Sequence, residues 1–212
     1  MKEITIDGIT YTIDTEDVFA VASVSKADEN LSGAITIADV INDDGFTYVV
    51  TSIAEYAFAH CAGITSIVIP EYINEICQSA FENCTGLTSI TILGFPRTIE
   101  SLAFRNCTAL ASITIPDSVR DIGGCTFENC TALTSVAIPE SVTALGGSVF
   151  EGCTNLTTVT LPGGLTYMGT YLFYNCPNLT AIRVPKGAKE TYSQIEGLEP
   201  WWELVQETEA ED

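Results

Sequence analysis

One motif recurs at a constant interval along most of this chain. A phenylalanine stands every 23 residues from Phe58 to Phe173, and a cysteine follows three residues after each of them, from Cys61 to Cys176. Self-similarity at a short, constant period is typical of solenoids, in which each repeat is one turn of a coil that stacks on the previous turn. The spacing therefore predicts a repeat solenoid, and it constrains the fold more than any local feature does.

Each repeat has the pattern of a half-buried strand. Counted from its phenylalanine, apolar residues stand five positions before and six, nine and eleven positions after, as Ile76, Leu87, Ile90 and Ile92 do around Phe81. The positions eight and ten after are mostly Ser, Thr or Ala. Such alternation predicts a mainly β coil whose strands turn their apolar side inward. Proline ends the strand in most copies, as expected for a residue that cannot donate to a ladder.

The repeat resembles a known family. The runs AFENCTGLTSITI (80–92), FENCTALTSVAIP (127–139) and FEGCTNLTTVTLP (150–162) are similar to the BspA-like leucine-rich repeats of bacterial surface proteins. The resemblance covers residues 49 to 185. It implies a right-handed leucine-rich-repeat horseshoe or rod, and a location at the cell surface or outside the cell.

Three segments follow from the limits of the repeat. Residues 1–48 are predicted to form an N-terminal β cap that includes a degenerate first repeat, with a hairpin in 4–13 around Asp7-Gly8, a strand in 19–25 and a loop in 25–33. Residues 49–185 hold six full repeats. Residues 186–212 are predicted to form a C-terminal cap, with a helix in 186–198 and an acidic, disordered tail in 207–212. Trp201 and Trp202 are expected to cover the open end of the core, and a carbohydrate-stacking platform is the alternative.

The charge of the chain excludes some partners. It has 28 Asp and Glu against 8 Lys and Arg, for a net charge of −20. There is no basic stripe that could bind nucleic acid, and no apolar run long enough to span a membrane. The first residues, MKEITIDGITY, lack the apolar core of a signal peptide. A surface location therefore requires that an export signal was removed, and a cytoplasmic chain is the alternative.

The reactive residues do not form a catalytic or metal site. His60 is the only histidine, so no triad is possible, and it stands beside Cys61, where a cysteine–histidine pair is the one nucleophile to consider. No Cys-x-x-Cys occurs, and Asp39, Asp43 and Asp44 do not match a calcium loop. We predict no enzyme activity, cofactor or metal. The eight cysteines are predicted to be free, with the repeated six buried and Cys77 and Cys125 too far apart to pair. The asparagines of the recurrent Asn-x-Thr triplets are predicted to cap turns; they are Asn83, Asn106, Asn129, Asn155 and Asn178.

Two surfaces are candidates for binding. The first is the outward side of the repeat strands, which is small and polar. It comprises Ser66, Val68, Ser89, Thr91, Ser112, Thr114, Ser135, Ala137, Thr158, Thr160, Ala181 and Arg183. The second is the junction after the second copy, where Leu93-Gly94-Phe95-Pro96 departs from the repeat. This departure predicts that Phe95 and Arg97 are exposed, and that Arg97 forms a basic cluster with Arg105 and Arg120.

These surfaces favour a protein that binds other proteins. The expected function is interaction or adhesion at the cell surface, with a host surface or extracellular-matrix protein as the partner and a glycan as an alternative ligand. A structural spacer without a ligand of its own is the alternative function.

Overall fold

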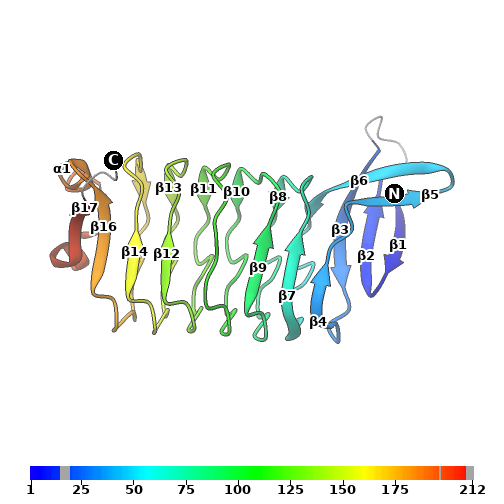
Figure 1. Ribbon diagram of the computed structural model, residues 1–212, viewed down its shortest axis with the longest axis horizontal. Coiled ribbons are helices and arrows are strands. Elements are labelled where there is room, and N and C mark those ends of the chain that lie inside the picture. Colours follow the sequence, from blue (N-terminus) through cyan, green and yellow to red (C-terminus); the bar gives the residue numbers. More distant parts are fainter. Residues whose placement is uncertain (15–19, 196, 209–212) are drawn as a thin grey trace.

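The computed structural model describes residues 1–14, 20–195 and 197–208. It is a rod in which successive coils lie side by side, with the N-terminal strands at one end and the C-terminal segment at the other (Figure 1). Strands in three sheets make up most of the regular structure, and the described residues contain one short α-helix and one 3-10 helix. The predicted mainly β solenoid is confirmed.

The first sheet runs the length of the rod. Its order is β1-β2-β3-β6-β8-β10-β11-β13-β15, and β5 pairs with β6 outside this path. The five strands from β8 onward are two residues long and parallel, and aligned residues such as Ile99 and Ile122 are 23 positions apart. The bounds are β1 (Lys2–Ile6), β2 (Ile9–Ile13), β3 (Val21–Ala27), β5 (Val40–Asp43), β6 (Phe46–Ile53), β8 (Glu75–Ile76), β10 (Thr98–Ile99), β11 (Asp121–Ile122), β13 (Ala144–Leu145) and β15 (Tyr167–Met168).

The other two sheets contain the strands that the repeat pattern predicts. All their pairings are parallel, and Val136, Val159 and Ile182 align across three neighbouring strands. One sheet comprises β4 (Ser32–Thr36), β7 (Gly63–Ile69) and β9 (Ser89–Ile92), and the other comprises β12 (Ser135–Ala137), β14 (Thr158–Thr160), β16 (Ala181–Pro185) and β17 (Val205–Thr208).

The N-terminal segment joins the coil earlier than its sequence indicates. The hairpin at Asp7-Gly8 is confirmed, because β1 and β2 pair antiparallel and both turn residues have positive φ. Residues 25–33 are not one loop, since β3 extends to Ala27 and β4 begins at Ser32. These two strands pair in parallel with β6 and β7, so they already form part of the stacked coil. Parallel pairing to the next turn overrides the loop-like composition of the segment.

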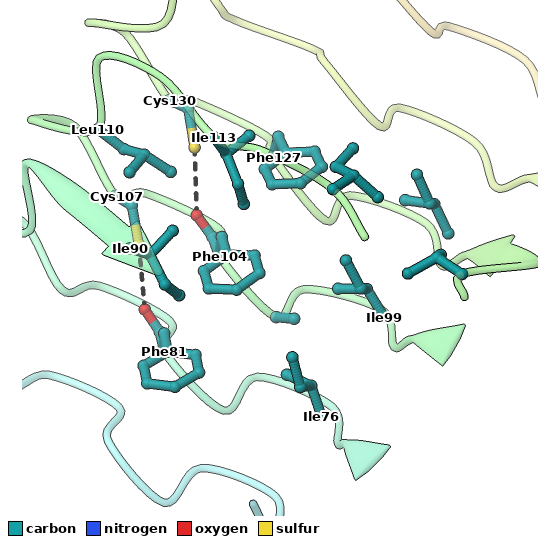
Figure 2. Close-up of a cluster of buried hydrophobic side chains, with 14 of the residues drawn as sticks. Ile76, Phe81, Ile90, Ile99, Phe104, Cys107, Leu110, Ile113, Phe127 and Cys130 are labelled. Atoms are coloured by element: carbon teal, nitrogen blue, oxygen red, sulfur yellow. Dashed lines mark hydrogen bonds between the residues drawn. The ribbon is translucent and has the colours of Figure 1, made fainter. Parts of the chain in front are cut away.

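The core is a set of ladders of identical residues. The six repeat phenylalanines are fully buried and stack from Phe58 to Phe173 with ring centroids 5.1 to 5.8 Å apart and nearly parallel planes. Figure 2 shows Phe81, Phe104 and Phe127 in this ladder, beside a second ladder that contains Ile76 and Ile99. Each ring buries its faces against its neighbours, which is why a single repeat cannot stand alone.

The repeat cysteines form a second kind of ladder. All eight cysteines are free thiols, and the repeated ones are buried except Cys176, which is half-buried. From Cys84 onward, each repeat thiol donates to the phenylalanine carbonyl of the preceding copy, as Cys107 does to Phe81 and Cys130 to Phe104 at 3.2 and 3.3 Å (Figure 2). Burial raises the pKa of these thiols, that of Cys107 to about 12 and that of Cys176 to about 11. The ladder is therefore a structural feature and its thiols are weak nucleophiles.

These raised pKa values predict a loss of stability at alkaline pH. The folded chain keeps a buried thiol protonated between the ordinary pKa of 9.0 and about 12, whereas the unfolded chain loses that proton. The free energy of unfolding should therefore be unaffected by these thiols below pH 9.0, and above it should fall by about 1.4 kcal/mol per pH unit for each such thiol. Urea unfolding at a series of pH values measures the slope. In the double variant Cys107→Ala/Cys130→Ala the slope should be shallower, and an unchanged slope would contradict the assignment to thiols.

The corners that hold the phenylalanines have an unusual backbone. In every copy the residues two before and two after the phenylalanine have positive φ, as Leu102 and Asn106 do at 64° and 58°. This conformation turns the N–H groups of Leu102, Phe104 and Asn106 toward carbonyl groups of the next copy, at 2.8 to 2.9 Å. Hydrogen bonds between coils therefore offset a conformation that costs free energy for most L-residues.

The C-terminal segment differs from its prediction in two respects. The helix is shorter than 186–198, since α1 spans Ala188–Tyr192, and the 3-10 helix η1 spans Glu199–Leu204. Residues 207 and 208, predicted as disordered tail, belong to β17, and the Glu207 carboxylate accepts from the Gly187 and Lys189 N–H groups. Residues 209–212 of the predicted tail lie outside the described residues. Trp201 meets the last phenylalanine, Phe173, edge-to-face at 5.6 Å.

Candidate functional site

The repeat strands present the first candidate surface as the alternation predicts. Along β9, Ser89 and Thr91 are exposed while Ile90 is buried, and β12 and β14 follow the same rule with Val136 and Val159 inside. Thr158 and Thr160 are half-buried, Arg183 is exposed, and Ala181 is buried, contrary to the prediction. We call this surface the sheet face. Arg183 is its one charged side chain, so it is nearly neutral on a strongly acidic chain.

The sheet face is interrupted in the middle. Residues 111–115 do not form a strand, so the sheet that ends at β9 does not continue into β12. Ser112 and Thr114 are still exposed and Ile113 and Ile115 are still buried, so the inward–outward pattern persists without the ladder. The prediction of a strand in every copy is therefore wrong for this one. The interruption lies in the copy that follows the junction at Leu93-Gly94-Phe95-Pro96, where the sequence departs from the repeat pattern.

The sheet face extends beyond the six repeats at both ends. At one end β4 places Ala34 and Thr36 beside Ser66 and Val68, and at the other end β17 places Gln206 beside Arg183. Sequence reasoning missed these residues because neither strand belongs to a copy with the phenylalanine. The Ala34-Ile35-Thr36 alternation was the signal available for β4.

The second candidate surface lies at the junction. Phe95 is 63% exposed, and Leu93 and Tyr72 are 53% and 54% exposed. The backbone beneath them is fixed, because the Phe95 N–H donates to the Ile73 carbonyl at 3.0 Å and Gly94 packs so closely on the same carbonyl that a Cβ would lie 2.3 Å from it. We call these three exposed side chains the junction patch. Their positions are held by ordered backbone, not by a loose loop.

Arg97 adjoins the junction patch, but Arg105 does not act with it. Phe95 and Arg97 line one groove of about 380 Å³ together with Glu75 and Glu100, so the groove contains charges of both signs. Arg105 instead lies between Glu82 and Glu128, with nitrogen–oxygen distances of 3.4 and 3.1 Å. The predicted cluster of three arginines is therefore wrong. Arg97 and Arg120 are backbone neighbours in adjacent copies, while the charge of Arg105 is compensated by the two glutamates.

The single histidine does not activate a nucleophile. His60 is exposed, and the Cys61 thiol is directed to the Asp28 carbonyl at 3.5 Å. Burial, and then the charges of Glu29 and Asp28, raise the pKa of Cys61 to about 11, the opposite of what a catalytic thiol needs. Among the described residues, no group of three His, Cys, Asp or Glu side chains is arranged to hold a metal ion.

Comparison with known proteins identifies the repeat. The family model of the BspA-type leucine-rich repeat region matches residues 87–195 with six copies. The chain belongs to the BspA-type leucine-rich repeat family. The phenylalanine and cysteine ladders are therefore the structural form that its repeats take in this chain.

Solved structures of other bacterial leucine-rich repeat proteins share the fold. A protein of Bacteroides ovatus is 32% identical with a TM-score of 0.76, and it is matched over 85% of this chain and 46% of its own. The leucine-rich repeat protein of T. pallidum is 26% identical with a TM-score of 0.75, over 92% of this chain and 98% of its own. A leucine-rich cell surface protein of Faecalibacterium prausnitzii is 26% identical with a TM-score of 0.69, over 87% and 55%. The chain thus spans about half the length of the first and third, and no curated protein matches it.

Proposed function

We propose that this chain is a non-enzymatic BspA-type repeat module that binds another protein at the bacterial cell surface or after secretion. The location is supported by the similarity to the cell surface protein of Faecalibacterium prausnitzii. None of the described helices is long and apolar enough to cross a membrane. The observation that carries the proposal is the junction patch, where an aromatic side chain is exposed on a rigid backbone.

The junction patch has the residue types that anchor protein interfaces. Large aromatic and arginine side chains dominate binding energy, whereas small polar residues contribute little. The sheet face alone would therefore make a broad, weak contact, and Phe95 with Arg97 would supply the anchor next to it. Because the backbone is already ordered there, binding loses little conformational entropy.

The charge of the chain indicates the kind of protein that would bind. A net charge of −20 attracts basic surfaces and speeds their encounter with the module. The nearly neutral sheet face can then be desolvated at low cost, since it carries one charge. We infer that the partner is a host surface or extracellular-matrix protein with a basic rim around an apolar pocket.

The double variant Phe95→Ala/Arg97→Ala should weaken binding to the partner about thirtyfold or more, because loss of an interface anchor costs on the order of 2 kcal/mol or more. The partner would be retained from purified host extracellular-matrix and cell-surface proteins on immobilised wild-type chain, and its affinity measured by surface plasmon resonance. The variant Ser89→Glu/Thr91→Glu should also weaken binding, since it places charge in the contact.

Tyr167→Ala provides the matched control, because Tyr167 is an exposed aromatic residue on β15, far along the coil from the junction patch. It should bind as the wild type does. If the wild-type chain retains no protein, or if the double variant binds unchanged, the proposal fails and a spacer role gains support.

A further inference from the structure

A pocket of about 780 Å³ lies at the C-terminal end of the rod, where η1 meets the last repeats. Its size lies within the range of ligand sites in proteins. The lining comes from the corners after three successive phenylalanines, with Asn129, Gly152 and Asn175 at equivalent positions, and from Trp201 of η1. The described residues that line it carry no charge, on a chain with 28 acidic residues.

One wall of the pocket is an interrupted ladder of amides. The Asn106 side chain donates to Asn83 Oδ1 at 2.8 Å, and the Asn129 side chain donates to Asn106 Oδ1 at 2.9 Å. The next rung is missing, because glycine stands at position 152. No described side chain donates to Asn129 Oδ1, and a Cβ at Gly152 would lie 2.2 Å from that atom. The Asn129 oxygen therefore reaches over the glycine into the place that a Cβ would take, and it is left without a donor from the next copy.

The far side of the gap offers complementary groups. One copy after Gly152, the equivalent position is again an asparagine, Asn175. It is exposed and has no side-chain hydrogen bond to the rest of the described chain. An amide supplies both donors and an acceptor. A ligand with several polar groups can thus donate to the Asn129 oxygen and also bond to the exposed Asn175 amide.

The opposite wall is aromatic. Trp201 is half-buried and is held edge-to-face against Phe173, and Tyr174 is 51% exposed and meets Tyr171 edge-to-face at 5.9 Å. Both rings are fixed by neighbours while part of their surface lines the pocket. Aromatic residues with an apolar ring face and a polar group exposed to solvent suit ligands that are apolar on one face and polar around the rim.

We propose that this pocket binds a neutral oligosaccharide. A sugar ring has C–H groups on its faces and hydroxyl groups around its rim, so it can pack on Trp201 while separate hydroxyl groups donate to Asn129 Oδ1 and bond to the Asn175 amide. The uncharged lining disfavours anionic and cationic ligands, since either would be desolvated there without a partner. This inference stands apart from the protein-binding proposal, because it uses the C-terminal end of the rod, whereas the junction patch lies beside β9 near the middle (Figure 1).

The test uses the two tryptophans as reporters. Trp202 packs against Lys189 and lines a separate, smaller pocket, so Trp202→Phe leaves Trp201 as the single reporter without altering the site. The fluorescence of Trp201 would be followed during titration with neutral tetrasaccharides of glucose, N-acetylglucosamine, xylose and mannose, and with a tetrasaccharide of galacturonic acid. A saturable change is expected with at least one neutral sugar and none with the acidic one.

Gly152→Asn, made in the same background, should weaken the response, because the new amide completes the ladder and bonds to the Asn129 oxygen. Asparagine already adopts positive φ at positions 106 and 129, and its Cβ would displace only the end of the Asn129 side chain and no backbone atom, so the chain should fold, and thermal unfolding verifies this. Binding should weaken at least about tenfold. Asn175→Ala should also weaken it, and because φ at position 175 is 55°, thermal unfolding verifies the fold of this variant too. Thr114→Asn on the sheet face should bind as the background does.

Three results would overturn the proposal. They are no response to any neutral tetrasaccharide, an equal response to the acidic one, and unchanged binding in both Gly152→Asn and Asn175→Ala. None of these results depends on whether the junction patch binds a protein, so the two proposals can fail separately.

Discussion

Replacing Phe104 by alanine is expected to lower the free energy of unfolding by about 3–5 kcal/mol. Phe104 is completely buried and stacks between Phe81 and Phe127 with centroids 5.3 and 5.6 Å away. The cavity cannot close, because the ring positions on both sides are fixed by hydrogen bonds between coils. Urea unfolding followed by circular dichroism measures the change.

Phe95→Ala is the control for Phe104→Ala. It removes the same side chain from a site that is 63% exposed, so its effect on stability should stay within about 0.5 kcal/mol. Equal losses in the two variants would mean that the phenylalanine ladder does not carry the core. A loss of stability confined to Phe104→Ala would support the ladder. It would also show that removal of the Phe95 side chain leaves the chain folded in the binding experiment.

Replacing Gly146 by alanine is expected to cost about 3 kcal/mol, at the upper end for overpacking. A Cβ at this position would lie 2.3 Å from the Gly124 nitrogen and 2.6 Å from its Cα, which are backbone atoms of the preceding copy. Backbone atoms cannot swing aside as a long side chain does, so the two coils must separate locally. Chemical unfolding of the variant measures the cost.

Gly164→Ala is the matched control, since its nearest neighbour would lie 4.0 Å from the new Cβ. Neither glycine has a φ in the left-handed range, so left-handed strain affects neither variant and the space around the new Cβ is the difference under test. Gly164→Ala should leave stability unchanged or raise it slightly by restricting the unfolded chain. A loss in Gly164→Ala as large as that in Gly146→Ala would contradict close approach as the cause.

The candidate sites were predictable to different degrees. The sheet face follows from alternation, because successive side chains of a strand must point to opposite sides. Phe95 and Arg97 were found because the repeat departs there. At Trp201 the sequence offered only a carbohydrate-stacking platform as an alternative, and the asparagine wall of the pocket was not predicted, because the two walls come from different elements. Only the folded chain places η1 against Phe173.

The sequence by itself determined the period, the ladders and the inward side of the repeat strands. Phe58 to Phe173 and Cys61 to Cys176 had to stack, because equivalent residues of successive coils lie one strand spacing apart. The tertiary structure alone decided the two-residue strands of the first sheet, the positive φ of residues as different as Leu102 and Tyr171, the interruption at 111–115 and the pairing of β17 with β16. These features depend on hydrogen bonds to a neighbouring coil. The residue type does not determine which carbonyl of that coil accepts from a given N–H group.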